Sequence, residues 1–244
     1  MRPEYRHFDQ LDSTNAYLQR MQTEDDIRGW VVSTDEQTAG KGMGSNGWES
    51  ENGKNLTFSM ALDMGFLPAE RQFLLSKTVA LGIIEVLDVL WTAKKLSIKW
   101  PNDLYYENRK LAGILINSTI KANMMDISIV GVGLNVNQTQ FQDWPTHPIS
   151  LKMITGKDYD LKPLLDQIVD SVYEKVSILK ATPNAIEEAY LQRLYRYHTW
   201  ADYEVGDKIK RLFMTGIDAF GRLQLVDDKN VPYCFDIKEI KFVI

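Results

Sequence analysis

Hydrophobic and polar positions alternate along the first part of the chain in the way that β-strands require. The alternation is clear in "LTFSMAL" at 56–62, and β-branched and aromatic residues fill "GWVVST" at 29–34. Another strand is predicted for "MMDISIVGVGLNVN" at 124–137. A hairpin is predicted where "LYY" at 104–106 and "KLAGILIN" at 110–117 flank the short turn "ENR".

Helices are predicted between these strands and after them. Asp12 or Ser13 can cap the first helix, and Pro68 suits the first position of the second. The predicted helices cover residues 14–22, 68–91, 161–179 and 184–198. Strands and helices in this order predict an α/β or α+β domain with a mixed sheet that is flanked by helices.

The chain changes character after about Ala201. Residues 203–244 consist of short β-forming runs separated by turns rich in glycine and aspartate. This pattern predicts a small β-barrel or sandwich, which has too little core to be very stable alone. We therefore expect two domains, residues 1–198 and residues 199–244.

Composition and charge narrow the class of protein. The chain has 244 residues, of which 44% are hydrophobic and 25% are charged, and these values are ordinary for a globular protein. The net charge of −5 argues against a general nucleic-acid-binding protein, because such proteins are usually basic. A local basic pocket remains compatible with this total.

Three further features bear on the compartment. The single cysteine, Cys234, excludes an intramolecular disulfide, which indicates a reducing environment. The N-terminus lacks an apolar signal segment. The most apolar long stretch, 73–91, is interrupted by Lys77, Glu85 and Asp88, so it predicts a buried or amphipathic helix and not a membrane span. We expect a cytoplasmic protein without a membrane partner.

Residues 35–55 form a long loop rich in glycine. The segment "GMGSNG" matches G-x-G-x-x-G, but no helix is predicted to start there, so it is not a dinucleotide fingerprint. It is not a Walker loop either, because Gly42 follows Lys41 where serine or threonine is needed. No acidic residue lies between Gln37 and Trp48. Two interpretations are open: a mobile surface loop, or a wrap around an anionic, aromatic ligand.

The predicted hairpin brings two opposite charges together. If Glu107 and Asn108 are the central turn residues, Lys110 pairs with Tyr105 and shares a face with Asp103. One interpretation is a surface ion pair worth about 0–1 kcal/mol. The other is a lysine that neutralises a substrate anion, while Asp103 holds a metal or orients the lysine.

Glycines interrupt two of the predicted strands. Gly131 and Gly133 indicate either a bulge or close packing, or else a gap for a flat ligand with Asn135 nearby as a polar group. Gly113 would let a ligand approach the hairpin backbone in the same way. The three histidines are scattered and no G-x-S-x-G is present. We therefore expect catalysis by positioning and charge stabilisation of phosphates, without a covalent enzyme intermediate.

Four segments in order resemble the biotin protein ligases. They are "STNAYL" at 13–18, "EQTAGKGMGSNGW" at 36–48, "KWPNDLYYENRKLAGIL" at 99–115 and "GVGLNVN" at 131–137. The later segment "GIDAFGRLQL" is similar to the small SH3-like domain of that family. The resemblance therefore implies a mixed-sheet catalytic domain followed by an SH3-like β-barrel.

The resemblance also implies a two-step reaction. Biotin and ATP, with Mg²⁺, give biotinyl-5′-adenylate and pyrophosphate. The biotinyl group then passes to a lysine of a biotin carboxyl carrier protein, which belongs to a biotin-dependent carboxylase. Family members act as monomers or as homodimers linked to adenylate binding, and the resemblance implies one of these states here.

Residue roles follow from the matching motifs. Lys110 would be the central catalytic lysine, and Asp103 would support it and serve as a ligand for Mg²⁺. The implied biotin-binding residues are Ser13, Thr14, Asn15, Gln37, Gly40, Lys41, Gly113, Ile114, Leu115, Gly131 and Gly133. The implied ATP- and adenylate-binding residues are Lys41, Gly42, Met43, Trp48, Asn102, Lys110 and Asn135.

The glycine loop departs from the family pattern. The family loop commonly reads G-R-G-R-x-G, whereas this chain carries Lys41 and Met43 and has no arginine in the loop. Lysine keeps one charge but lacks the two-pronged guanidinium, so we expect the adenylate to leak faster than in members that have the arginines.

Three expectations complete the resemblance. The ligase motifs begin at Ser13, which leaves no room for the N-terminal DNA-binding domain of some members, so we expect no DNA binding. One alternative is a lipoate-type ligase of the same fold, but "KWPND" and "GVGLNVN" fit biotin better. The other is a sensor that binds biotin or adenylate without catalysis, and the retention of Lys110 and Asp103 argues against it.

Overall fold

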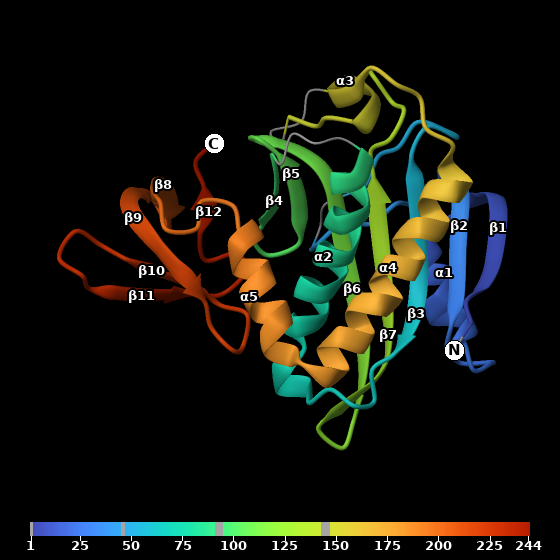
Figure 1. Cartoon of the computed structure of the whole chain (residues 1–244), viewed down its shortest axis with the longest axis horizontal. Helices are drawn as coiled ribbons and strands as arrows, with labels where there is room; N and C mark the ends of the chain where they lie inside the picture. Colours follow the sequence, from blue (N-terminus) through green and yellow to red (C-terminus); the bar gives the residue numbers. More distant parts are fainter. Residues whose placement is uncertain (1, 45–46, 91–94, 143–146) are drawn as a thin grey trace.

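A seven-stranded mixed sheet forms the centre of the molecule. The computed structural model describes residues 2–44, 47–90, 95–142 and 147–244. The strands are β1 (Glu4–Leu11), β2 (Trp30–Gln37), β3 (Leu56–Asp63), β4 (Leu96–Lys99), β5 (Asp103–Tyr106), β6 (Arg109–Lys121) and β7 (Met124–Leu134). Their order in the sheet is β1-β2-β3-β7-β6-β5-β4 (Figure 1). β1 pairs with β2 in parallel and the other neighbours are antiparallel, which confirms the predicted mixed sheet.

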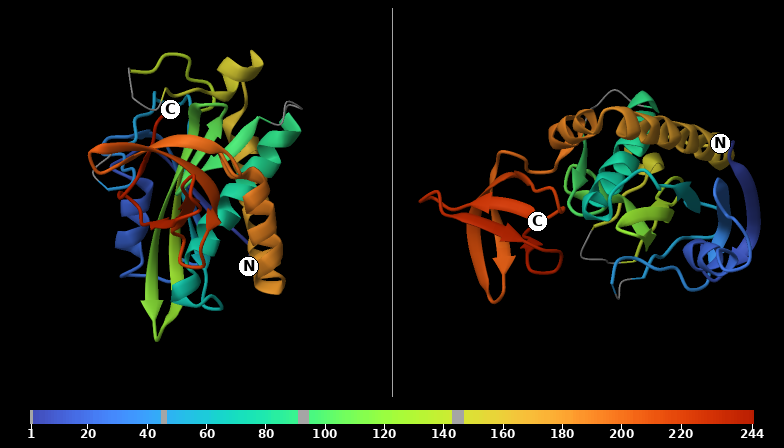
Figure 2. Two further views of the ribbon diagram at one scale, coloured as in Figure 1. Left: turned by 90° about the vertical axis from the view of Figure 1, so that its left-hand side faces the viewer. Right: turned by 90° about the horizontal axis from the view of Figure 1, so that it is seen from below.

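Helices cover both faces of this sheet. They are α1 (Thr14–Met21), the short 3₁₀ helix η1 (Ala69–Arg71), α2 (Phe73–Leu90), α3 (Leu151–Thr155), α4 (Leu161–Ala181) and α5 (Pro183–Arg193). The orange helices α4 and α5 lie with α2 on one side, and the blue α1 lies on the other (Figure 2). Ser13 caps α1 as predicted, because its hydroxyl accepts a hydrogen bond from the backbone N–H of Ala16.

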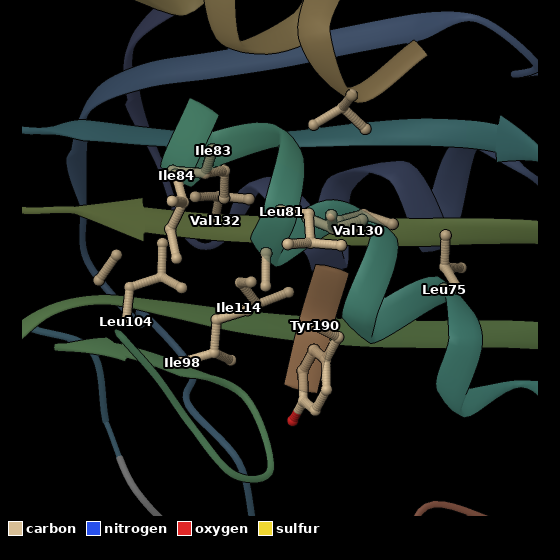
Figure 3. Close-up of a cluster of buried hydrophobic side chains, with 14 of the residues drawn as sticks. Leu75, Leu81, Ile83, Ile84, Ile98, Leu104, Ile114, Val130, Val132 and Tyr190 are labelled. Carbon is tan, nitrogen blue, oxygen red and sulfur yellow. The ribbon is translucent and has the colours of Figure 1, made fainter. Parts of the chain in front are cut away.

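Alternation along β3 assigns its side chains to the two faces. Phe58 and Met60 belong to the large core under α2 and α4. Figure 3 shows part of that core around Val132. Thr57 and Ser59 point to the opposite face, since successive side chains in a strand alternate. The polar face of an otherwise buried strand therefore turns toward α1.

Two predicted helix boundaries are wrong. Pro68 is extended and precedes η1, and α2 begins only at Phe73, because the N–H of Ala69 donates to Asn123 in the turn between β6 and β7. The predicted end near Trp91 lies outside the described residues. The last helix stops at Arg193, since the N–H of Tyr195 donates instead to Ile98 of β4.

The sequence pattern also missed three elements, β1, β4 and α3, and overextended one strand. β1 was not predicted, because it is an edge strand whose residues are mostly exposed and lack a clear apolar face. α3 is only five residues long and is bounded by the cap Ser150 and by Gly156 in the left-handed conformation. The strand predicted over 124–137 ends at Leu134, where the backbone turns to meet other partners.

The C-terminal part is a five-stranded antiparallel sheet. Its strands are β8 (Trp200–Val205), β9 (Lys208–Ile217), β10 (Leu223–Val226), β11 (Pro232–Phe235) and β12 (Lys241–Phe242), in the order β11-β10-β9-β8-β12. Within the described residues β11 and β12 do not pair, so the sheet is open but compatible with an SH3-like unit. Its Tyr203 belongs to the core under α2, and Trp100 donates to the carbonyl of Gly221 at 2.8 Å. The division into two domains, residues 1–198 and 199–244, stays a prediction.

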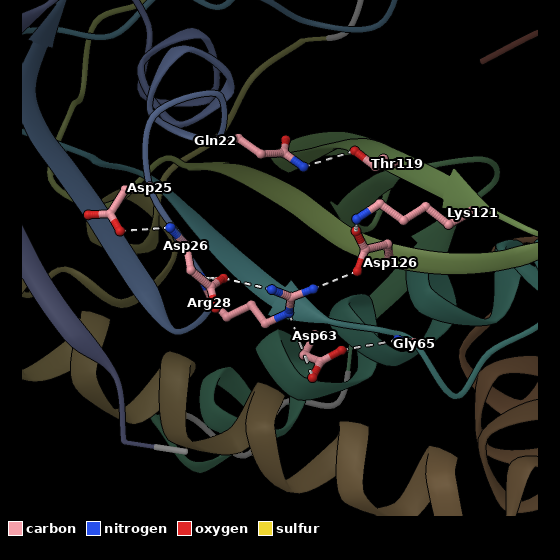
Figure 4. Close-up of polar contacts among 9 residues, drawn as sticks. All are labelled: Gln22, Asp25, Asp26, Arg28, Asp63, Gly65, Thr119, Lys121 and Asp126. Carbon is pink, nitrogen blue, oxygen red and sulfur yellow. Dashed lines mark hydrogen bonds and ion pairs between the residues drawn. The ribbon is translucent and has the colours of Figure 1, made fainter.

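A cluster of paired charges lies at the far end of the central sheet (Figure 4). Arg28 contacts Asp26 at 2.7 Å and Asp126 at 2.6 Å, and Lys121 contacts Asp126 at 2.6 Å. The pKa of Asp126 is lowered, chiefly by the hydrogen bond from Lys121 and further by Arg28. Each cation here has a carboxylate partner, as is usual for charges that hold a fold together.

α2 is the most apolar helix of the chain. It is buried along most of its length, and Lys77 within it forms an ion pair with Glu187 of α5. In the part of the chain that the structure describes, no helix is both long enough and apolar enough to cross a membrane.

Candidate functional site

The predicted site residues gather around one cavity on the face of the sheet that carries α1. The cavity lies between the N-terminus of α1, the glycine loop and strands β3, β5, β6 and β7. It is lined by Ser13, Thr14, Asn15, Gln37, Lys41, Gly42, Met43, Gly47, Trp48, Thr57, Phe58, Asn102, Asp103, Lys110, Gly113, Ile114, Leu115, Gly131, Val132 and Gly133. Its volume is about 110 Å³. Pockets for drug-sized ligands usually have volumes of roughly 300–1,000 Å³. This cavity is smaller, because a side chain fills part of it.

One end of the cavity is a network of uncharged hydrogen-bonding groups. The Gln37 side-chain oxygen accepts from the backbone N–H of Thr14 at 2.9 Å. The Ser59 hydroxyl lies 2.7 Å from the Thr14 hydroxyl and 2.5 Å from the Asn15 side-chain oxygen. Asn15 also donates to the carbonyl of Leu115 at 3.2 Å. These groups hold each other in fixed orientations, which prepares them to read a neutral polar ligand.

Three glycines make the floor of the cavity. Gly131 and Gly133 lie in β7, and Gly113 lies opposite Gly133 in β6. A Cβ at Gly131 would overlap the side chain of Asn15, and a Cβ at Gly133 would overlap the indole of Trp48. The ladders continue through both positions without a shift, so the interpretation as a bulge is wrong. The glycines instead make room for side chains above the sheet.

Trp48 occupies that room. Its indole lies over Gly133 and approaches Gly113, and its Nε1 is buried without a hydrogen-bond partner among the described residues. The hydroxyl of Thr57, opposite Gly133 in β3, is also buried and unpaired in that part of the chain. Two polar groups in one cavity without partners are unusual in a folded protein and indicate a place where a ligand would supply them.

The other end of the cavity is charged. Tyr105 pairs with Lys110 as predicted, and the Lys110 ammonium contacts the Asp103 carboxylate at 2.7 Å. Both side chains are largely buried, at 22% and 14% exposed. The pair is therefore not the surface ion pair of the first interpretation. A lysine in this position faces the cavity and lies 5.9 Å from the centre of the Trp48 ring.

A straight row of residues joins this charged end to the glycine floor. Thr57, Gly133, Gly113, Asp103 and Lys99 are successive partners across five neighbouring strands. Residues that are partners across a sheet share a face. Lys99 therefore stands at the end of the same row, one strand beyond Asp103. Burial lowers its pKa, although the charge of Asp103 acts in the opposite direction.

Comparison with known proteins agrees with this geometry. The sequence profile of the biotin/lipoate A/B protein ligase family matches residues 7–135. The bifunctional ligase/repressor BirA of Salmonella typhimurium is 31% identical over 227 residues, which cover 89% of this chain and 68% of that protein. The chain belongs to the biotin/lipoate A/B protein ligase family.

Other members of the family extend the comparison. The BirA protein of Bacillus spizizenii is 27% identical over 66% of this chain, which spans 50% of that protein's length. The biotin protein ligase from Aquifex aeolicus, solved in complex with biotin and ATP, has the same fold, with a TM-score of 0.80 over 98% of this chain and 99% of that one. Its sequence is 22% identical. The biotin protein ligase resemblance is thus confirmed at the level of the family and of the fold.

Three predicted site residues do not direct a side chain into the cavity. Asn135 is buried, does not line the cavity, and donates its amide to the carbonyl of Ile149 at 3.1 Å. Gly40 does not line it either; a side chain there would clash with the backbone of Trp48, so it shapes the loop. Ile114 packs its side chain into the core of Figure 3, and its carbonyl accepts from Asn102 at 2.7 Å. Their ligand roles, like those of the other predicted site residues, stay predictions.

Sequence reasoning missed Ser59 and Thr57. Both lie in a strand that was recognised, and their signal was the presence of small polar residues on one face of an apolar run. That signal says which residues share a face but not which face meets α1. Ser59 does not itself line the cavity, but its contacts hold Thr14 and Asn15, which do.

Few donors near Lys110 could hold a divalent cation. Asp103 offers one carboxylate, and one of its oxygens already contacts Lys110. Asn102 adds an amide oxygen, since its nitrogen donates to Ile114. A single carboxylate suits Mg²⁺ that arrives with substrate phosphates and keeps most of its water, but not a permanent cation. Among the described residues, the side chains that come together with metal-like spacing are His7, Asp9 and Asp35, and none of them lines the cavity.

Proposed function

We propose that this chain is a biotin protein ligase, which activates biotin with ATP and transfers it to a lysine of a carrier protein. The observation that carries the proposal is the polarity of the cavity. One end offers an uncharged hydrogen-bonding network, the floor is bare glycine, and the other end holds Lys110 and Asp103. Biotin has a matching order of groups: a urea, an apolar ring system and chain, and a carboxylate.

The neutral end suits the urea of biotin. A urea has a carbonyl that accepts and two N–H groups that donate, so it requires both kinds of partner. The hydroxyls of Ser13 and Thr14 and the amide of Asn15 supply both. The thiophane ring would lie on the glycine floor once the indole of Trp48 has moved away from it.

Lys110 would act where the two substrates meet. A carboxylate oxygen of biotin attacks the α-phosphorus of ATP; the new C(O)–O–P bond forms, the bond to the β-phosphate oxygen breaks, and pyrophosphate leaves. Carboxylate and phosphate repel each other, and charge builds on the phosphoryl oxygens in the transition state. The Lys110 ammonium, fixed by Asp103, offsets both effects.

The second step joins the biotinyl group to the carrier. The carrier's lysine amine attacks the mixed-anhydride carbonyl, and AMP leaves with its phosphate near Lys110. Trp48 and the loop that carries it exclude water from that anhydride when they lie over the site. Mg²⁺ would neutralise the phosphates, and Asp103 is the residue that supports its binding.

The remaining features of the function are part of the same proposal. The partner is a biotin carboxyl carrier protein, and the reaction takes place in the cytoplasm, where ATP and reduced thiols such as Cys234 are found. We place neither DNA nor a membrane among its partners, and we propose either a monomer or a homodimer formed with the adenylate.

A transfer assay tests the proposal. The full chain is incubated with labelled biotin, MgATP and a purified biotin carrier domain, and label on the carrier is measured. We expect stable transfer by the wild type and loss of about 10³-fold or more with Lys110→Ala, because a charge aimed at the reacting phosphate is removed. Lys95→Ala is the matched control, since Lys95 is an exposed lysine just before β4 whose partner is Glu107.

Each other outcome points to an alternative. Transfer of lipoate in place of biotin would mean a lipoate-type ligase. Biotin binding without adenylate formation would mean a sensor. Either result would overturn the proposal.

A further inference from the structure

An aromatic cage surrounds Lys99 where the central sheet meets the C-terminal sheet. The Lys99 ammonium lies 5.2 Å from the centre of the Tyr105 ring and 4.9 Å from that of Phe242 in β12. Tyr203 of β8 packs against Phe242 with ring centres 5.1 Å apart. The cage therefore takes its walls from both sheets.

A second cation belongs to this cage. Arg196, in the connection from α5 to β8, lies with its guanidinium 5.1 Å from the ring centre of Tyr195. Tyr195 in turn packs against Tyr105 and Phe242. Arg196 is held there with a φ of 62°, which is uncommon for a residue other than glycine.

The donors of the cage lack acceptors. Nη1 of Arg196 and the hydroxyl of Tyr203 are buried, and neither has a hydrogen-bond partner within the described residues. The Lys99 ammonium forms no hydrogen bond or ion pair with any residue of that same part of the chain. Burial raises the pKa of Tyr203 to about 12, so its hydroxyl remains a donor at neutral pH.

The charge around the cage is unbalanced. The groups that act on the Lys99 ammonium are Asp103, Lys110 and Arg196, so three cations share one carboxylate. That carboxylate already contacts Lys110. Buried charges are normally paired, because an unpaired charge loses its hydration without compensation. Cation–π contacts offset only about 0.5–2 kcal/mol of that loss.

The Arg28 cluster of Figure 4 shows that this chain pairs its cations elsewhere. There Arg28 and Lys121 share three carboxylates, from Asp26, Asp63 and Asp126. The surplus of positive charge is thus a property of the cage and not of the chain, whose net charge is −5.

We propose that Lys99, Arg196 and the Tyr203 hydroxyl form a binding site for a phosphate oxyanion. Phosphate oxygens accept several hydrogen bonds and favour arginine and lysine together. Lys99 stands at the end of the row that runs from the glycine floor through Asp103. The site is therefore placed to take the outer phosphates of a nucleotide that lies in the cavity, and the pyrophosphate that leaves. That assignment of the oxyanion rests on the proposed function, whereas the site itself does not.

Calorimetric titration of the full chain tests the site directly. Sodium pyrophosphate and sodium phosphate are titrated separately at constant ionic strength, without biotin or nucleotide. We expect one pyrophosphate to bind per chain. Lys99→Met, Arg196→Met and Tyr203→Phe should each weaken it, by about tenfold for the two cations, because each removes a charge-assisted hydrogen bond.

Matched controls separate binding from general damage. Lys95→Met removes an exposed lysine next to the same strand, and Tyr190→Phe removes a buried hydroxyl that is also unpaired within the described residues. Neither should change the affinity. Lys99→Arg keeps the charge and should restore most of the binding that Lys99→Met loses, which guards against a fault in folding.

A second titration identifies the source of the oxyanion. If a non-hydrolysable ATP analogue prevents pyrophosphate from binding, the site takes the phosphates of the nucleotide. If phosphate binds together with the analogue, the site takes a free phosphate. Both results support the site.

Two results would overturn it. One is that neither anion binds to the wild type at millimolar concentration. The other is that Lys99→Met and Arg196→Met bind the anions as the wild type does, which would make the cage a purely structural contact. Failure of carrier biotinylation would overturn the proposed function alone, since these titrations use neither biotin nor carrier.

Discussion

The two ends of the cavity differ in whether their polar groups are paired within the protein. At the neutral end the side chains of Thr14, Asn15, Gln37 and Ser59 satisfy each other, so the network is in place before any ligand arrives. At the charged end three cations share Asp103, and the surplus has no partner among the described residues.

This difference teaches how the two kinds of ligand group are recognised. A urea is recognised through hydrogen bonds of fixed direction. A rigid network whose members already satisfy each other supplies these bonds at little cost on binding. A polyphosphate is read by charge, which requires cations that the protein leaves uncompensated at some loss of stability. Substitutions at the neutral end should therefore lower ligand affinity, whereas removal of an uncompensated cation at the charged end should raise the free energy of unfolding.

The largest expected effect is at the floor that joins the two ends. Gly133→Ala places a methyl group in the space of the Trp48 indole and of any ring on the floor. Overpacking of about 1–3 kcal/mol corresponds to a loss of about 5- to 150-fold in biotin affinity, measured by calorimetry. Gly65→Ala is the control, because a Cβ there meets only the Asp63 side chain, at 3.4 Å. Unchanged affinity in Gly133→Ala would mean that the floor does not hold the ligand.

A smaller effect is expected within the neutral network. Ser59→Ala removes the hydroxyl that lies between Thr14 and Asn15 and leaves buried groups without a partner. Such a loss costs about 1–3 kcal/mol, so biotin affinity should fall about tenfold while ATP affinity is unchanged. Ser118→Ala, which removes a hydroxyl paired with Ser128 in the same sheet, should change neither. An equal fall in ATP affinity would contradict separate recognition at the two ends.

At the charged end, removal of a cation should raise the stability of the protein. Lys99→Met removes an ammonium without an ion-pair partner in the described part of the chain and keeps a side chain of similar length among the rings. We expect the free energy of unfolding to rise by about 1 kcal/mol, which raises Tm by about 2–4 °C for a chain of this size. Arg28→Met should lower Tm, because it breaks paired charges. A lower Tm for Lys99→Met would show that the cage stabilises its cation fully.

The smallest effect concerns acid stability beside the neutral end. The pKa of Asp12 is lowered from 3.8 to about 2, mainly by hydrogen bonds from Arg20, which ties the last turn of α1 back to its start. A carboxyl with a lowered pKa in the folded state stabilises the protein above the unfolded value of 3.8, and this is lost as the pH falls through about 2. Asp12→Asn should therefore make the decline of the unfolding free energy between these pH values shallower. The change should be slight, since both side chains are about half exposed; an identical decline would contradict the assignment.

The hairpin was predictable because its turn is short. Two residues between the strands fix the pairing of Lys110 with Tyr105, and Asp103 lies two positions before Tyr105 on the same face of the strand. The glycine positions were predictable as gaps for a similar local reason. In each case the information lies within a few residues of the feature.

The charged cage was not predictable, because its parts come from distant segments. Lys99 and Arg196 are almost 100 residues apart in the sequence, and the backbone that joins them takes a left-handed turn at Arg196 and His198 with no glycine or proline to announce it. The setting of Asn135 was not predictable either. It is adjacent in sequence to the floor of the cavity, but the chain leaves the sheet after Leu134, and the side chain is used to hold Ile149.

The position of Trp48 has a consequence for kinetics. The indole and a ligand on the glycine floor exclude each other, so the Trp48 side chain competes with the ligand for the same space. The measured affinity for such a ligand is the affinity of the emptied form reduced by the fraction of molecules in which the indole has moved away. Loop substitutions that never touch the ligand can then tighten binding. At high ligand concentration the association rate levels off at the rate at which Trp48 departs, which the fluorescence of that indole would report.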